Sequence, residues 1–117
     1  MRLHNVNSSY FSDCLFDGNE GKDGGGLGIR KASTVLERIV FQRNYGTDDG
    51  GALSLEAGYP DSQVIGNDIL FQNNFGIENG GALFSSKLPY VNLTNVDFRN
   101  NTCFDDGLLT LFHFMLS

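Results

Sequence analysis

Short runs of alternating apolar and polar residues lead to each of four phenylalanines, Phe16, Phe41, Phe71 and Phe98. Alternation with a period of two is typical of β-strands, and the chain shows no helical periodicity. The positions two residues before the phenylalanines hold Cys14, Ile39, Ile69 and Val96, and a less regular apolar position five residues before them holds Phe11, Leu36, Gly66 and Leu93. The pattern therefore predicts one strand before each phenylalanine.

A shared polar sequence follows each phenylalanine, so the chain contains an internal repeat. The pattern is Phe-x-x-Asn-x-Gly, then Asp or Asn, then Gly-Gly-Ala-Leu, and it is clearest over residues 41–55 and 71–84. The copy over 16–29 has a shorter loop, and the copy that begins at Phe98 loses the second glycine and the alanine. The repeated positions, which we interpret as structural, are Phe16, Asn19, Phe41, Asn44, Gly50, Gly51, Phe71, Asn74, Gly80, Gly81, Phe98 and Asn101.

A repeat of short strands and Gly/Asn/Asp turns cannot bury its apolar side alone and must stack on its neighbours. The copies start 25, 30 and 27 residues apart, which suits loops of variable length between fixed strands. The sequence thus predicts an all-β fold: a right-handed, single-stranded parallel β-helix of about four coils of 25–30 residues, forming one unit over residues 1–117. Coils about 4.8 Å apart would give a stub on the order of 20 Å long.

The repeated residues favour structural roles over binding roles. Each phenylalanine is in phase with the apolar residue two positions earlier, which predicts an interior stack and not a carbohydrate-binding strip. The asparagines are expected to stack and to bond one coil to the next or to turn backbone, with a ligand-binding row as the alternative. The glycine pairs are expected to allow positive φ or the close approach of a neighbouring coil.

Acidic or amide residues precede the glycines at Asp23, Asp49, Asn79 and Asp106. Calcium needs six to eight oxygen ligands at one point, and the nonapeptide pattern of calcium-binding β-rolls is absent, so we predict turn-forming side chains and no metal site, with a weakly held cation left open. Gly24–Gly28 lacks the Gly-Lys-Ser/Thr of a phosphate loop. His4 and His113 lie far apart in the sequence. No catalytic, cofactor-binding or metal-binding residue is predicted.

Composition narrows the classes of partner. Eight basic against fourteen acidic residues give a net charge of −6, which argues against nucleic acid as a partner.

Cys14 and Cys103 would lie in different coils, too far apart for a disulfide, with Cys14 a small buried residue and Cys103 at a turn. The start of the chain carries no secretory signal pattern, and no apolar run reaches the length of a membrane-spanning helix. We expect a piece of a larger β-helix or a truncated gene product.

The ends of such a piece would expose strand edges, so self-association through the coil ends is a further expectation. Residues 108–117 are apolar on both strand faces and are interpreted as a terminal strand or a cap. Three sequons, at Asn7, Asn92 and Asn100, would matter only in a secreted eukaryotic chain.

Phe-x-x-Asn paired with Gly-Gly-Ala-Leu resembles the double signature of the polymorphic outer membrane protein repeat of chlamydial autotransporter adhesins. The resemblance spans Phe16 to about Leu111 and is best over 41–54 and 71–84. It implies a surface-exposed or secreted passenger-type β-helix used for adhesion, located outside the cell or at the outer membrane, and not an enzyme.

The function expected from the sequence is a non-enzymatic cell-surface module that contacts a protein or glycan. The alternative is a fragment of a β-helix polysaccharide lyase or glycoside hydrolase, which would group carboxylates in one cleft. Against this alternative, the repeated acids are spread over turns and the arginines do not recur at one position of the repeat.

Overall fold

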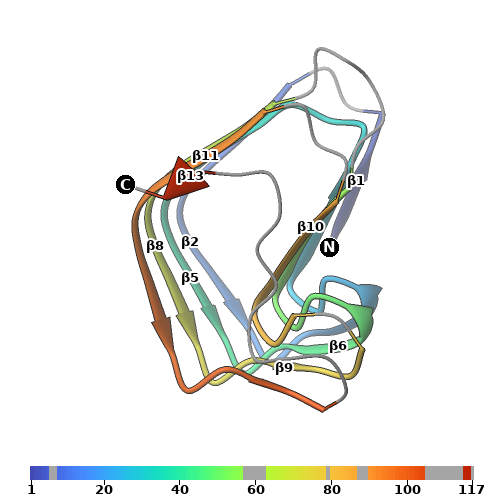
Figure 1. Ribbon diagram of the computed structural model, residues 1–117. Coiled ribbons are helices and arrows are strands. Elements are labelled where there is room, and N and C mark those ends of the chain that lie inside the picture. The colour runs from blue at the N-terminus through green and yellow to red at the C-terminus, as the bar shows by residue number, and fades with distance from the viewer. Residues whose placement is uncertain (6–7, 57–62, 79, 87–89, 105–114, 117) are drawn as a thin grey trace.

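The chain folds as a parallel β-solenoid, seen along its axis in Figure 1. The computed structural model describes residues 1–117 except 6–7, 57–62, 79, 87–89, 105–114 and 117. Three parallel sheets form its walls, and in the described residues no helix occurs that is able to span a bilayer. The strands are β1 (Arg2–His4), β2 (Ser9–Asp17), β3 (Glu20–Asp23), β4 (Leu27–Arg30), β5 (Thr34–Gln42), β6 (Tyr45–Asp49), β7 (Leu53–Glu56), β8 (Gln63–Gln72), β9 (Phe75–Gly76), β10 (Leu83–Ser86), β11 (Tyr90–Arg99), β12 (Thr102–Cys103) and β13 (Met115–Leu116).

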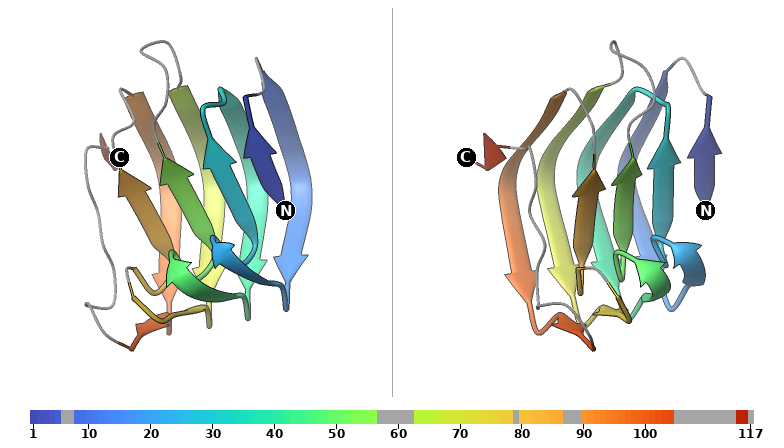
Figure 2. Two further views of the ribbon diagram at one scale, coloured as in Figure 1. Left: turned by 90° about the vertical axis from the view of Figure 1, so that its right-hand side faces the viewer. Right: turned by 45° about the vertical axis from the view of Figure 1, so that its right-hand side comes forward.

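Each turn of the solenoid contributes one strand to each wall. The long wall consists of β2, β5, β8, β11 and β13, the short wall of β3, β6, β9 and β12, and the third wall of β1, β4, β7 and β10. In Figure 1 each turn runs down its long strand, across the bottom and up the third wall, so the chain turns anticlockwise. Later turns lie nearer the viewer. This is a right-handed coil. Three turns are complete, β2–β4, β5–β7 and β8–β10, and β11 and β12 begin a fourth. The all-β, right-handed parallel β-helix predicted from the sequence is therefore confirmed (Figure 2).

The repeat defines columns of side chains that run along the axis. Strand pairing places Phe16, Phe41, Phe71 and Phe98 in one register, and the apolar positions two and five residues earlier in two more. The third wall adds Leu27, Leu53 and Leu83, which are all fully buried. Because every turn adds to the same columns, each interior residue is buried mainly by the equivalent residues of the neighbouring turns.

A left-handed residue interrupts the alternation of each long strand at the same height. The residues are Asp13, Arg38, Asp68 and Asn95, with φ between 52° and 58°. In β5, Leu36 and Ile39 both point inward although they are an odd number of positions apart, three, because the left-handed Arg38 adds an extra outward position. This explains why the apolar position five residues before each phenylalanine shares the interior with the position two residues before it.

The ends of the described chain also pair with the walls. β1 lies beside β4, with Leu3 aligned with Ile29. The apolar tail predicted as a strand or cap falls mostly outside the described residues, but its Met115 and Leu116 pair with β11. Cys14 and Cys103 are both free. The prediction that Cys103 occupies a turn is wrong: it lies in β12, aligned with Gly76, because the chain extends there into the short wall.

Candidate interaction surface

The asparagines of Phe-x-x-Asn form a hydrogen-bonded ladder through the wall of the solenoid. Asn44 Oδ1 accepts bonds from the backbone N–H and the side-chain amide of Asn19, at 3.0 and 3.2 Å. Asn74 Oδ1 does the same for Asn44, and Asn101 Oδ1 for Asn74. Asn44 and Asn74 are 1% exposed. Their polar atoms are used inside the fold, which leaves them no capacity to form the ligand-binding row that was the alternative.

The ladder also holds the backbone of the turn that precedes it. Asn44 Nδ2 donates to the Phe16 carbonyl at 2.9 Å, and Asn74 Nδ2 donates to the Phe41 carbonyl at 3.0 Å. The residue before each asparagine is left-handed: Gly18, Arg43, Asn73 or Asn100. That conformation ends the long strand and turns the asparagine inward, so Phe-x-x-Asn encodes a corner of the solenoid.

The phenylalanine column is an interior stack. Adjacent ring centroids along Phe16, Phe41, Phe71 and Phe98 lie 4.9, 5.0 and 4.9 Å apart, with interplanar angles of 16°, 6° and 6°. Phe41 and Phe71 are fully buried. The spacing equals that of neighbouring strands in a sheet, so each turn adds one ring to the stack.

The glycine pairs form the second corner, where the turns approach each other closely. Gly50 and Gly80 have φ of 69° and 67°, which L side chains adopt at a cost. A Cβ on Gly51 would overlap the carbonyl oxygen of Gly81 and the backbone of Phe75 in the next turn. The first glycine therefore provides a left-handed turn, and the second permits close contact between turns.

Since these repeated residues face inward, the outward side chains of the long wall are the surface available to a partner. This outer face comprises the outward residues of β2, β5, β8 and β11. It carries two apolar rows, Tyr10–Val35–Ile65 and Leu15–Val40–Leu70, in which neighbours are aligned across the strands. Tyr10, Leu15 and Ile65 are 60%, 59% and 39% exposed. Sequence reasoning missed these rows; their signal was the second set of apolar positions, one residue before each interior position.

Charged side chains border the apolar rows on the same face. Arg38 Nε and Nη2 donate to the two carboxylate oxygens of Asp13 at 2.6 and 3.0 Å. These bonds lower the pKa of the Asp13 carboxyl below its usual value and raise the pKa of Arg38. Tyr10 donates to Glu37, and this hydrogen bond raises the pKa of the Tyr10 hydroxyl.

A second pair of this kind lies at the end of the strand. Arg43 donates through Nε, at 2.8 Å, and through Nη2 to the carboxylate of Asp17, to which Gln42 also donates at 3.1 Å. The bonds from Arg43, and then the one from Gln42, lower the pKa of the Asp17 carboxyl. Each pair joins neighbouring turns, and because the pairs are exposed they add little to stability.

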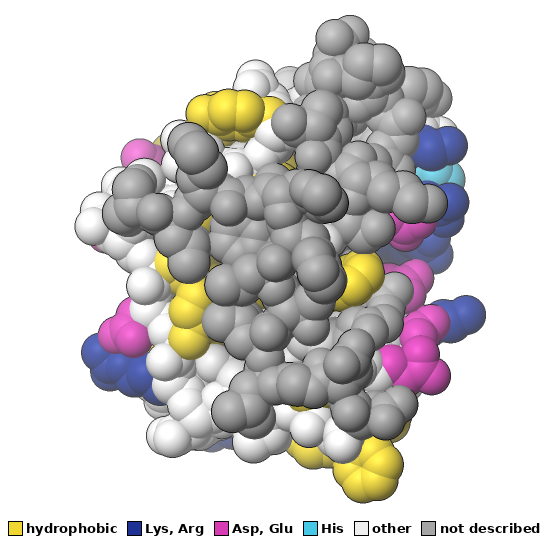
Figure 3. All heavy atoms as spheres, in the orientation of Figure 1, with side chains coloured by type: hydrophobic (Ala, Val, Ile, Leu, Met, Phe, Trp, Pro, Cys, Tyr) yellow, Lys and Arg dark blue, Asp and Glu magenta, His cyan; other side chains and the backbone are white. Residues whose placement is uncertain are grey.

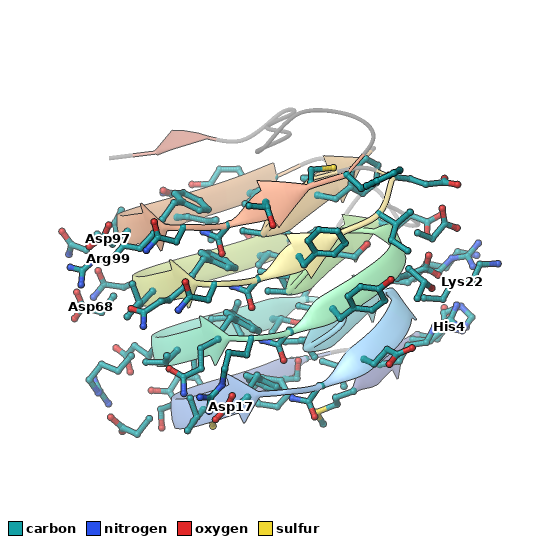
Figure 4. All side chains as sticks on the ribbon, turned by 90° about the horizontal axis from the view of Figure 1, so that it is seen from below. His4, Asp17, Lys22, Asp68, Asp97 and Arg99 are labelled. Carbon is teal, nitrogen blue, oxygen red and sulfur yellow. The ribbon has the colours of Figure 1, made fainter. Side chains whose placement is uncertain are left out.

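The described charges are distributed around the outside of the solenoid. In Figure 4, Asp17, Asp68, Asp97 and Arg99 lie at the side of the long wall, and His4 and Lys22 lie at the opposite side. Figure 3 shows acidic and basic side chains next to one another on both flanks. The outer face is thus apolar in two rows with mixed charge beside them, and it has no basic stripe of the kind that binds nucleic acid.

The short wall carries an outward aromatic pair. Tyr45 and Phe75 stack with centroids 5.4 Å apart and an interplanar angle of 5°. Each ring covers one face of the other, and Tyr45 is 36% exposed. The pair supports the stacking of the turns and leaves the long wall as the stronger candidate surface.

The two described acidic residues that precede the glycines, Asp23 and Asp49, lie at the ends of short strands. Asp23 and Asp49 are the last residues of β3 and β6 and are aligned, so they lie at strand ends and not in loops. Asn79 and Asp106 lie outside the described residues. Among the residues that are described, no three His, Cys, Asp or Glu side chains lie close enough to hold a metal ion. An open depression of about 310 Å³ beside Asp23 is lined by Met1, Arg2, Gly21, Lys22 and Gly24, with Asp23 its one carboxylate among these residues.

Stacked asparagine and phenylalanine columns with paired glycines define the class of this protein as a Phe-x-x-Asn parallel β-solenoid. Residues 68–86, which run from the end of β8 into β10, match the Chlamydia polymorphic membrane protein repeat. The third turn of the solenoid is therefore a repeat of this type, and the register shows that the other turns copy its geometry. Neither a search of curated proteins nor a search of solved structures found a match.

Proposed function

We propose that this chain is a non-enzymatic segment of a β-helix displayed outside the cell or at an outer membrane, and that its outer face contacts a protein or glycan partner. The observation that carries the proposal is the match of residues 68–86 to a membrane protein repeat, within a solenoid whose repeated polar residues are used to build its walls. Surface placement of the chain follows from the family name and is part of the proposal.

The two apolar rows give the outer face its binding capacity. Aligned side chains at a strand spacing of about 4.8 Å form a flat apolar strip, and exposed apolar strips with polar borders are typical of contact surfaces. Ile65 and Leu70 are the last members of the two rows, and they lie in β8, which has a neighbouring long strand on each side. A partner that binds the outer face would therefore cover these two residues.

An adhesion assay tests the proposal. Beads coated with the purified protein are incubated with cultured epithelial cells and with immobilised matrix proteins and glycans, and bound beads are counted. The double variant Ile65→Thr and Leu70→Thr keeps strand propensity and removes apolar area, and Tyr45→Thr with Phe75→Thr is the matched control on the short wall. We expect the first variant to bind several-fold less and the control to bind like the wild type.

Two results would contradict the proposal. Coated beads that bind no better than albumin-coated beads would rule out the adhesive role. Release of unsaturated or reducing sugars from pectin-like polymers by the purified chain would show an enzyme and support the lyase or hydrolase alternative.

A further inference from the structure

The first turn leaves one end of the interior open. Phe11, Cys14 and Phe16 are only partly buried, whereas their partners in the second turn, Leu36, Ile39 and Phe41, are at most 1% exposed. One face of the Phe16 ring packs on Phe41. Its other described ring contact is a T-shaped one with Phe11 of the same turn, with centroids 6.1 Å apart, so no described ring of a further turn stacks on Phe16 and the apolar columns end at this surface.

The asparagine ladder has a direction, and the open end presents its acceptor side. In the second, third and fourth turns the asparagine Oδ1 accepts two hydrogen bonds from the asparagine one turn earlier. Asn19 donates to Asn44 in this manner, but no described residue donates to Asn19 Oδ1. Filling that acceptor as in the other turns requires a backbone N–H and a side-chain amide from one further asparagine.

The three walls also end in strand edges at this surface. β2 and β3 are the terminal strands of their sheets. A terminal strand of a parallel sheet leaves alternate N–H and C=O groups without a ladder partner, and these groups accept another strand. β1 already occupies the outermost position of the third wall, where it pairs with β4. The other two walls therefore offer a ready template for a further turn.

We infer that the N-terminal end of the solenoid is a docking surface for one further Phe-x-x-Asn turn, running parallel to β2 and β3. Its phenylalanine would cover Phe16, and its asparagine would donate to Asn19 Oδ1. A two-fold contact between the N-terminal ends of two copies would instead make the strands antiparallel and place one Asn19 acceptor opposite the other. The ladder therefore selects a head-to-tail neighbour.

The strand register specifies how to build the test. Arg2 is aligned with Gly28, and Gly28 with Ser54, so Met1 corresponds to Leu53. A copy of residues 31–52 joined directly before Met1 should therefore place the copied asparagine beside Asn19. The control carries the same extension with Phe41→Ser and Asn44→Ala in the copy only, and the original turns are unchanged.

Two readouts are used, the thermal midpoint and hydrogen exchange of residues 9–17. We expect the extension to raise Tm by about 5 °C or more and to slow exchange in β2, and the control to do neither. Asn19→Ala should lower Tm by more degrees in the extended chain than in the original chain, because only in the extended chain does Asn19 Oδ1 accept hydrogen bonds from another turn.

Three outcomes would overturn the inference: an unchanged Tm and unchanged β2 exchange, an equal gain with the control extension, or a two-fold dimer of the original chain through its N-terminal end in sedimentation and cross-linking. None of these readouts depends on adhesion. Failure here is therefore distinct from failure of the proposed function.

Discussion

Replacing Phe71 with alanine removes one of the two fully buried rings of the interior stack. Phe71 is fully buried and lies 5.0 Å from the Phe41 ring and 4.9 Å from the Phe98 ring. Truncation of a buried phenylalanine costs about 3–5 kcal/mol. Each stacked pair adds about 0.5–1.5 kcal/mol beyond area burial, and two pairs are lost, so we expect the upper part of that range. A domain of this size has a total stability of about 5–15 kcal/mol, so the loss is large.

Phe98→Ala is the matched control for this change. Phe98 is partly exposed and stacks on Phe71 alone among the described rings, so its loss should cost about half as much. Equilibrium unfolding in guanidinium chloride, followed by circular dichroism, gives both free energies of unfolding. Equal losses for the two variants, or a loss below about 1 kcal/mol for Phe71→Ala, would refute the interior stack.

Three further changes test other parts of the fold by the same unfolding measurement. Asn74→Ala leaves the Phe41 carbonyl without its amide donor, and we expect a loss of about 1–3 kcal/mol for each buried group left unpaired; a loss within error would contradict the ladder. Gly51→Ala drives a Cβ into the backbone of the next turn and should cost about 3 kcal/mol or more, so wild-type stability would show that the turns are further apart. Arg43 lowers the pKa of Asp17, so their ion pair stabilises the fold above the unfolded Asp pKa and loses this effect as pH falls through the lower folded pKa. Arg43→Gln should therefore reduce the fall in Tm below about pH 4, and an unchanged pH profile would contradict this.

The repeat was sufficient to predict which residues share a column. Constant spacing between Phe41 and Asn44, and again between Phe71 and Asn74, fixes the same corner in each turn, and parallel stacking then brings equal positions together. The glycine pair was also informative, since Gly50 and Gly51 stand where backbone from two turns meets. Each column consists of the same motif position in successive repeats, so the repeats within one sequence are enough to predict it.

Some features that depend on side-chain direction were not predicted. The left-handed Arg38 shifts the alternation of β5 by one residue, and nothing in the residue type marks that conformation. The outward row of Leu15, Val40 and Leu70 was hidden because exposed aliphatic residues resemble core residues in a composition pattern. Cys103 was assigned to a turn by analogy with glycine, although a strand accommodates either residue.

A paired-cysteine experiment tests the solenoid register most directly. In a background with Cys14→Ser and Cys103→Ser, Val40→Cys and Leu70→Cys would be aligned on neighbouring outward positions, about 4.8 Å apart. Val40→Cys with Asp97→Cys would be two turns apart, beyond the roughly 7 Å limit of a disulfide. We predict rapid air oxidation of the first pair within the monomer and none of the second. Bridging of the second pair, or equal failure of both, would contradict the parallel stacking of the turns.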